Sequence, residues 1–177
     1  MTALSRHVLR VRIPVSIVAL AVLVAGMYRV HTMSGRFVYG SLVLGGAIQS
    51  DLDIGTRYIS RNMTYIMAFS VLILYAAENR LASPPIGGAL GVLSIFWILH
   101  VWKNNAIGFG DVLFAPTLVL YIGWFRADIL LVWILVAAVI AVLTAVCRRQ
   151  RYVAFVPPLV SAAILATLLA GESEYAQ

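Results

Sequence analysis

Seven long apolar runs, separated by short polar segments, are the feature that most limits how this chain can fold. The runs cover roughly residues 13–28, 37–50, 63–77, 86–102, 112–125, 129–146 and 153–170. Of the 177 residues, 62% are hydrophobic and only 11% are charged, whereas about 25% are charged in an average soluble domain. A membrane-spanning helix needs roughly 20 apolar residues. The runs therefore predict an all-α fold, a polytopic membrane helix bundle of about seven transmembrane helices.

The runs also predict one integral membrane domain over residues 1–177, without strands or a linker. Continuous apolar runs differ from the alternating pattern of membrane-spanning strands. Three arginines precede the first run, as they do in a secretory signal. No small-x-small cleavage site precedes Arg29, and further apolar runs follow. We therefore interpret residues 13–28 as an uncleaved leading span.

The basic residues indicate membrane orientation rather than nucleic-acid binding. The net charge is +6, but the lysine and arginines lie in short clusters between apolar runs. With the amino terminus in the cytoplasm, nine basic residues fall inside and four outside, which the positive-inside rule favours. The inside residues are Arg6, Arg10, Arg12, Arg57, Arg61, Lys103, Arg148, Arg149 and Arg151, and the outside ones are Arg29, Arg36, Arg80 and Arg126. The lipid bilayer is the expected partner, and no nucleic acid is expected.

Two aspartates, Asp53 and Asp111, are the candidate catalytic residues. Both fall on the predicted cytoplasmic side, although that side was assigned from the lysine and arginine residues alone. Asp53 follows the run at residues 37–50, and Asp111 precedes the run at residues 112–125. Each run has only about 14 apolar residues, which is short for a bilayer. Either these helices continue into their polar flanks, or the aspartate segments begin below the membrane surface. Acidic residues at such helix ends are costly to bury and often mark function.

The segment around Asp111 favours close approach of a peptide. Gly108, Phe109 and Gly110 precede the aspartate, and the two glycines leave space beside the carboxylate. Two neighbouring carboxylates share a proton, so that one acts as general base on water and the other as general acid. The residues alone leave a structural alternative open, in which each aspartate caps a helix or pairs with Arg57, Arg61 or Lys103.

Three segments together resemble the type IV prepilin peptidases, which are membrane aspartyl proteases of the Gly-x-Gly-Asp kind. Residues 108–124 are similar to the second aspartate motif and the helix that follows it. Residues 53–62 are similar to the first motif, in which an aspartate precedes a basic stretch and then Ile-Pro-Asn. Residues 153–157 are similar to the Ile-Pro-Phe-Gly-Pro segment at the start of the last helix. The likeness covers about residues 37–170, and its register selects Asp53 rather than Asp51.

The resemblance implies a compact, peptidase-only aspartic endopeptidase of the prokaryotic cytoplasmic membrane. Such enzymes cut the short basic leader of prepilin-like or preflagellin-like precursors, which carry class III signals, at the cytoplasmic face. Asp53 and Asp111 would be catalytic, with Arg57 and Lys103 as substrate or electrostatic neighbours. The cysteine-rich zinc segment of larger, methylating members has no counterpart here.

This chain departs from the family pattern at four positions. Leu113 stands where a lysine or arginine is common, and Ser60 replaces a proline. Ala154 and Val156 replace the proline and glycine of the last motif. The departures keep a second hypothesis open, in which the chain is a catalytically degenerate member, acting as a membrane assembly partner or a small transporter.

No cofactor or metal is expected from the sequence. A single cysteine, Cys147, excludes an internal disulfide and a thiolate metal cage. The three histidines show no metal-ligand spacing, and no glycine-rich nucleotide loop occurs. No nucleophile lies near a histidine motif, so serine and cysteine hydrolase mechanisms are disfavoured.

Overall fold

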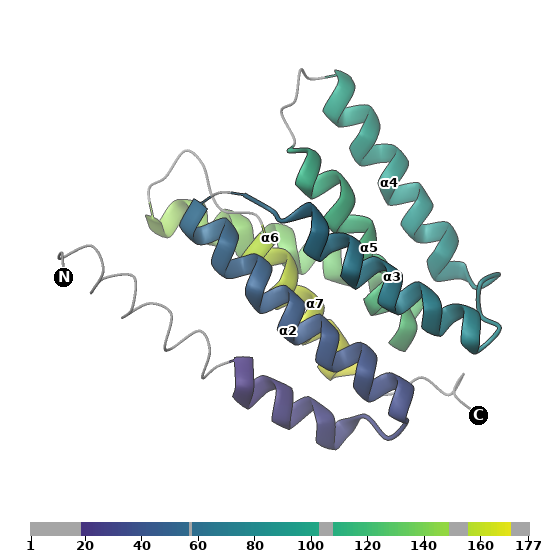
Figure 1. Cartoon of the computed structure of the whole chain (residues 1–177). Helices are drawn as coiled ribbons and strands as arrows, with labels where there is room; N and C mark the ends of the chain where they lie inside the picture. Colours follow the sequence, from purple (N-terminus) through teal and green to yellow (C-terminus); the bar gives the residue numbers. More distant parts are fainter. Residues whose placement is uncertain (1–18, 57, 103–107, 149–155, 171–177) are drawn as a thin grey trace.

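Every regular element in the described part of the chain is helical. The computed structural model describes residues 19–56, 58–102, 108–148 and 156–170 (Figure 1). A leading helix, Ala19–Arg29, comes first. The elements that follow are α2 (Met33–Thr56), α3 (Arg61–Ala77), α4 (Pro84–Trp102), α5 (Phe109–Phe125), the 3-10 turn η1 (Ala127–Ile129), α6 (Leu130–Arg148) and α7 (Val156–Ala170). The prediction of an all-α chain is confirmed over these residues.

The helices of the two shortest apolar runs continue into their polar flanks. α2 extends to Thr56, so Asp51 and Asp53 lie in its last two turns. α5 begins at Phe109, so Asp111 lies in its first turn. Between the two alternatives that the sequence left open, the structure thus has the longer helices, with both aspartates inside a helix end.

One described helix, α4, is long and apolar enough to cross a membrane by length and composition. It has 19 residues, and its apolar window has a mean hydropathy of 1.6. α3 and α5 have 17 residues each, or about 25 Å of helix, against about 30 Å of bilayer hydrocarbon. A topology of seven spans therefore stays a prediction.

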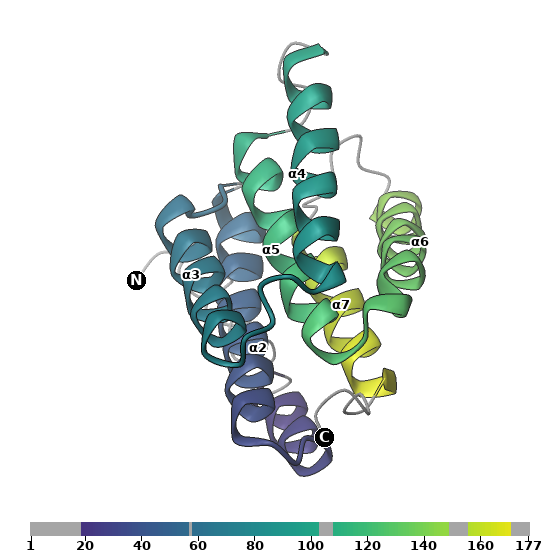
Figure 2. The same ribbon diagram turned by 90° about the vertical axis from the view of Figure 1, so that its right-hand side faces the viewer.

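α5 is the central helix of the bundle. It contacts α2, α3, α4, α6 and α7, and it lies between α3 and α4 in the views of Figures 1 and 2. Thirteen of its residues are buried, including every residue from Phe114 to Phe125. A helix that is apolar all round is stable where other helices surround it. The burial of α5 therefore fixes where Asp111, at its first turn, lies in the molecule.

The carboxyl end of α5 is held to α3 by aromatic and cationic contacts. The rings of Tyr75 and Trp124 meet edge to face with centroids 4.9 Å apart. The guanidinium of Arg80 lies over the Trp124 ring at 4.9 Å. The Tyr75 hydroxyl donates to the Leu120 carbonyl at 3.1 Å. These contacts anchor the end of α5 that is farthest from Asp111.

Small residues allow α4 and α5 to approach closely. A Cβ added to Gly123 would lie 2.6 Å from Cγ of Pro85, a contact that the rigid proline ring cannot relieve. In contrast, a Cβ added to Gly91 of α4 would meet no atom within 4 Å. Glycine at membrane helix contacts generally serves such close packing.

Gly123→Ala should therefore lower the thermal unfolding midpoint of the detergent-solubilised protein, because overpacking a close helix contact costs about 1–3 kcal/mol. Gly91→Ala is the matched control. It should leave the midpoint unchanged or raise it slightly, because alanine favours a helix over glycine by about 1 kcal/mol. An equal response of the two variants would contradict the proposed packing of α4 on α5.

Candidate active site

Asp53 is buried at the carboxyl end of α2 and is tied to the start of α7. Its side chain is 7% exposed, and its Oδ2 accepts the backbone N–H of Val156 at 2.9 Å. The first N–H groups of a helix lack partners within that helix and attract negative charge. Asp53 thus caps α7 from a position 103 residues earlier in the chain.

Asp111 lies in the first turn of α5, directly after the Gly108-Phe109-Gly110 segment. The backbone N–H groups of Asp111 and Val112 donate to the Gly108 carbonyl at 3.0 and 3.2 Å, which starts the helix. The Oδ1 atom of Asp111 is buried and has no hydrogen-bond partner in the described part of the chain. A buried carboxylate oxygen without a partner is costly. This atom therefore has hydrogen-bonding capacity that no described residue uses.

The two aspartates line the same cavity, although 58 residues separate them. The cavity has a volume of about 390 Å³. Segments from α2, the α2–α3 connection, the start of α3 and the start of α5 form its wall. The lining residues are Asp53, Tyr58, Ile59, Arg61, Gly108, Phe109, Gly110 and Asp111. The structure therefore brings together the residues that the sequence selected, apart from two basic residues that it does not describe.

Those two basic residues, Arg57 and Lys103, lie outside the described residues, as does Ala154 of the last motif. Asp51 is half-buried in α2 and is not part of the cavity wall. Asp51 and Asp53 differ by two positions, or about 200° around a helix. The geometry is thus consistent with the register argument for Asp53, and catalysis by either aspartate stays a prediction.

The pKa of Asp111 reflects its burial and, to a lesser degree, the neighbouring carboxylate. Asp111 precedes Val112, where the apolar segment of α5 begins, so its carboxyl lies outside that segment. The pKa of Asp111 is raised to about 6, mainly by burial and also by the negative charge of Asp53. A hydrogen bond with the Gly108 backbone opposes this rise. Two carboxyls that interact in this way titrate as a pair and readily hold one proton between them.

Gly110 lets the two halves of the cavity wall meet. A Cβ added to Gly110 would lie 2.7 Å from Cβ of Ile59. Ile59 lies in the connection between α2 and α3, six residues after Asp53. The second glycine of the Gly-x-Gly-Asp segment therefore has a packing role, because its missing side chain admits the wall that comes from the first aspartate motif.

The residue that the sequence analysis missed is Gln49, which is fully buried one turn before Asp53 in α2. Its side-chain amide bonds to both backbone groups of Ser60, at 2.9 and 3.0 Å. A glutamine inside an apolar membrane run is costly unless it is paired. That cost is the signal by which the sequence could have revealed it.

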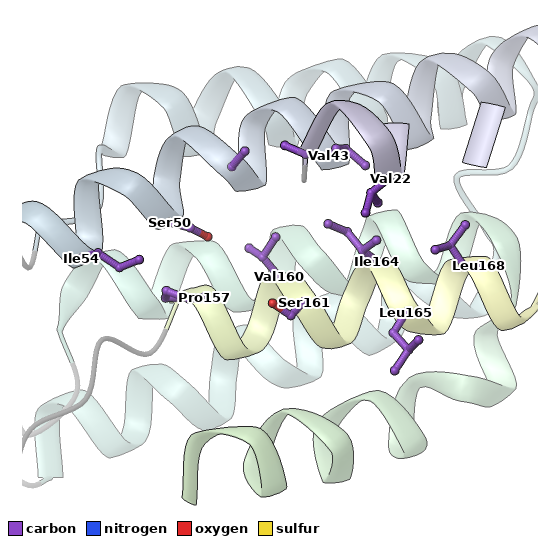
Figure 3. A pocket seen from close by; sticks show the side chains of 12 residues that line it. Val22, Val43, Ser50, Ile54, Pro157, Val160, Ser161, Ile164, Leu165 and Leu168 are labelled. Carbon is purple, nitrogen blue, oxygen red and sulfur yellow. The ribbon is translucent and has the colours of Figure 1, made fainter. Parts of the chain in front are cut away.

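A second, larger cavity is apolar and offers no groups for hydrolysis. It has a volume of about 570 Å³ and lies between the leading helix, α2 and α7 (Figure 3). Val43, Val160, Ile164 and Leu168 are typical of its lining, and Ser50 and Ser161 contribute hydroxyls. Neither aspartate lines it. The smaller cavity is therefore the candidate active site.

Comparison with known proteins identifies the class of protein to which this fold and site belong. The sequence model of the type IV leader peptidase family matches residues 40–146, which is more than half of the chain. The matched range contains both aspartates and the whole cavity wall. The chain therefore belongs to the type IV leader peptidase family, whose members are aspartic-type peptidases and typically membrane proteins. No curated protein and no solved structure matches the chain.

The raised pKa of Asp111 gives a pH-dependent prediction for Asp111→Asn. An acid with a raised pKa stabilises the fold below its ordinary pKa, and this contribution disappears as the pH rises through about 6. The neutral asparagine avoids the cost of a buried charge. Asp111→Asn should therefore increase stability by about 1–3 kcal/mol near pH 8 and much less near pH 4.5. Thermal unfolding in detergent at both pH values measures this difference.

Asp128→Asn is a control with the opposite sign. The pKa of Asp128 is lowered by its hydrogen bond and charge interaction with Arg126. The carboxylate of Asp128 is therefore the favoured form in the folded protein, and its loss should not stabilise the protein near neutral pH. Equal stability of wild type and Asp111→Asn at both pH values would contradict the burial of Asp111 beside Asp53.

Proposed function

We propose that this protein is an aspartic endopeptidase that removes the short basic leader of prepilin-like precursors. The observation that most supports this proposal is the cavity of about 390 Å³ that Asp53 and Asp111 line together. The chain that forms it belongs to the type IV leader peptidase family. Family membership supports a leader peptidase in general. The identity of the precursor class comes from the resemblance of the three motifs.

The proposed reaction uses the aspartates as a pair that holds one proton. The ionised carboxylate takes a proton from a water molecule, and the water oxygen attacks the carbonyl carbon of the scissile peptide. The protonated carboxyl donates its proton to the carbonyl oxygen. The tetrahedral intermediate then collapses: one of its hydroxyls gives its proton to the ionised carboxylate as the carbonyl re-forms, the carbon–nitrogen bond breaks, and the leaving amine takes the proton of the other carboxyl. The pair returns to its singly protonated state after one turnover.

The contacts of the two aspartates support a pair that shares one proton. Asp53 accepts the Val156 N–H at 2.9 Å. Asp111 is raised in pKa and has a buried oxygen without a protein partner. The two carboxyls therefore hold one shared proton in the resting enzyme, which belongs to the pair rather than to either residue.

The proposed setting is the cytoplasmic face of a prokaryotic cytoplasmic membrane, with the amino terminus in the cytoplasm. The bias of nine basic residues against four supports this orientation. Asp53 lies in the last turn of α2 and Asp111 in the first turn of α5. Both are therefore placed at the boundary between an apolar helix and its polar flank. A precursor with a basic leader ahead of an apolar helix would present its scissile bond at that level.

Replacing either cavity aspartate should abolish cleavage. Asp53→Asn and Asp111→Asn each remove an acid–base group and should lower the cleavage rate by about 10³-fold or more. The assay uses purified protein in detergent with a prepilin-like precursor that has a basic leader and a glycine before its apolar helix. Cleavage is followed by the mass of the shortened product.

Asp51→Asn is the matched control, because Asp51 lies two residues from Asp53 but outside the cavity wall. It should retain activity within about threefold of wild type. Normal cleavage by Asp53→Asn or Asp111→Asn would refute the proposed function. Folding of each variant is checked by its unfolding midpoint.

A further inference from the structure

Gln49 uses both donor positions of its side-chain amide and also its carbonyl oxygen in hydrogen bonds to α3 and its N-cap. It is 0% exposed and lies in α2, four residues before Asp53. Its Oε1 accepts the Ser60 N–H at 3.0 Å. Its Nε2 donates to the Ser60 carbonyl and to the Thr64 hydroxyl, both at 2.9 Å. The amide therefore binds both backbone groups of one residue at the start of α3.

The Ser60 N–H is the donor that depends on Gln49. The Ser60 carbonyl also accepts from the Thr64 backbone N–H and hydroxyl, each at 3.0 Å, so it keeps partners without Gln49. The Ser60 N–H has Gln49 Oε1 as its partner in a part-buried bond. An N–H in such a position is destabilising when it loses its acceptor. Loss of the Gln49 amide would thus disturb Ser60 through this one group.

Proline would fit at position 60 without any such acceptor. The backbone of Ser60 has φ −70° and ψ 111°, and the ring of proline holds φ near −65°. Proline has no N–H, so it would need no acceptor from α2. In this chain, a serine therefore brings a donor to this position, and Gln49 binds it.

The segment that Gln49 holds is the wall between the two aspartates. Tyr58 and Ile59, directly before Ser60, line the polar cavity. Ile59 packs against Gly110, next to Asp111. Gln49 itself lies one helical turn from Asp53, on the same helix end. A contact chain thus runs from α2 through Gln49, Ser60 and Ile59 to the start of α5.

We propose that Gln49 is a positioning residue of the active site, which fixes the Tyr58–Ser60 segment and thereby the start of α5 relative to Asp53. Its side-chain hydrogen bonds go to Ser60 and Thr64 and not to either carboxylate. This inference rests on the proposed function for its effect on cleavage. Its structural part, the coupling of residue 60 to the start of α5, does not depend on that function.

The first test is a rescue of cleavage by a second substitution. Gln49→Leu leaves the Ser60 N–H without its acceptor and should lower kcat by between about tenfold and a hundredfold, with KM within about threefold. Gln49→Leu combined with Ser60→Pro removes that N–H as well and should return kcat to within about threefold of wild type. Ser60→Pro alone leaves Oε1 of Gln49 without this donor and should give an intermediate kcat.

Thr64→Val is the matched control for the amide cluster. It removes the hydroxyl that Gln49 donates to, but it leaves the bond between Ser60 N–H and Gln49 in place. Its kcat should stay within about threefold of wild type. A merely structural role for Gln49 would lower the unfolding midpoint of Gln49→Leu without changing kcat per folded molecule. That result, or a double variant as impaired as Gln49→Leu, would overturn the proposal.

Hydrogen exchange tests the coupling without reference to cleavage. Gln49→Leu should speed exchange of backbone amides in residues 58–64 and also in residues 108–113, and the double variant should restore protection in both. Unchanged exchange in residues 108–113 would overturn the proposed coupling. If wild type protects both segments as expected but cleaves no precursor, the proposed function fails while the coupling stands.

Discussion

The hydrogen bond from the Val156 amide to Asp53 links the parts of this molecule on which the candidate site depends. It joins the last turn of α2 to the first residue of α7, and α7 in turn packs against α2, α5 and α6. Pro157 and Pro158 follow Val156 and lack N–H groups. Val156 thus supplies an early backbone donor of α7, and Asp53 uses it. This bond gives a buried carboxyl of the cavity wall a backbone donor, next to the second carboxyl that lines the same cavity.

Two departures from the family pattern have a physical interpretation in this light. Val156 replaces a glycine, but its contact with Asp53 uses the backbone N–H, which any residue except proline provides. Ser60 replaces a proline, and the N–H that this change introduces is bound by Gln49. At both positions, the backbone N–H of the residue present here makes a hydrogen bond near the cavity. Leu113 lies next to buried Val112 in α5 and is not part of the cavity wall.

The two ends of α5 serve different purposes. At its carboxyl end, Trp124 and the close contact of Gly123 with Pro85 hold α5 against its neighbours. At its amino end, Gly110 admits Ile59 and Gly108 lies beside the Asp111 carboxyl, and both glycines line the cavity. A helix that is buried from Phe114 to Phe125 thus carries Asp111 on a first turn that borders the cavity. Such placement by a packed helix suits the acid–base role that we propose for Asp111.

The sequence by itself determined the helical class and the approximate helix positions, because continuous apolar runs are local patterns. It also indicated Asp53 and Asp111 as candidates, through Gly-x-Gly-Asp and the register of the first aspartate motif. Helix ends were less certain, since α2 and α5 extend into polar flanks where hydropathy gives no signal. Only the tertiary structure decided that Asp53 and Asp111 line one cavity, that Asp53 binds the start of α7, and that Gln49 holds Ser60. These contacts join residues from 11 to 103 positions apart. They depend on how whole helices pack, which no local pattern of residues specifies.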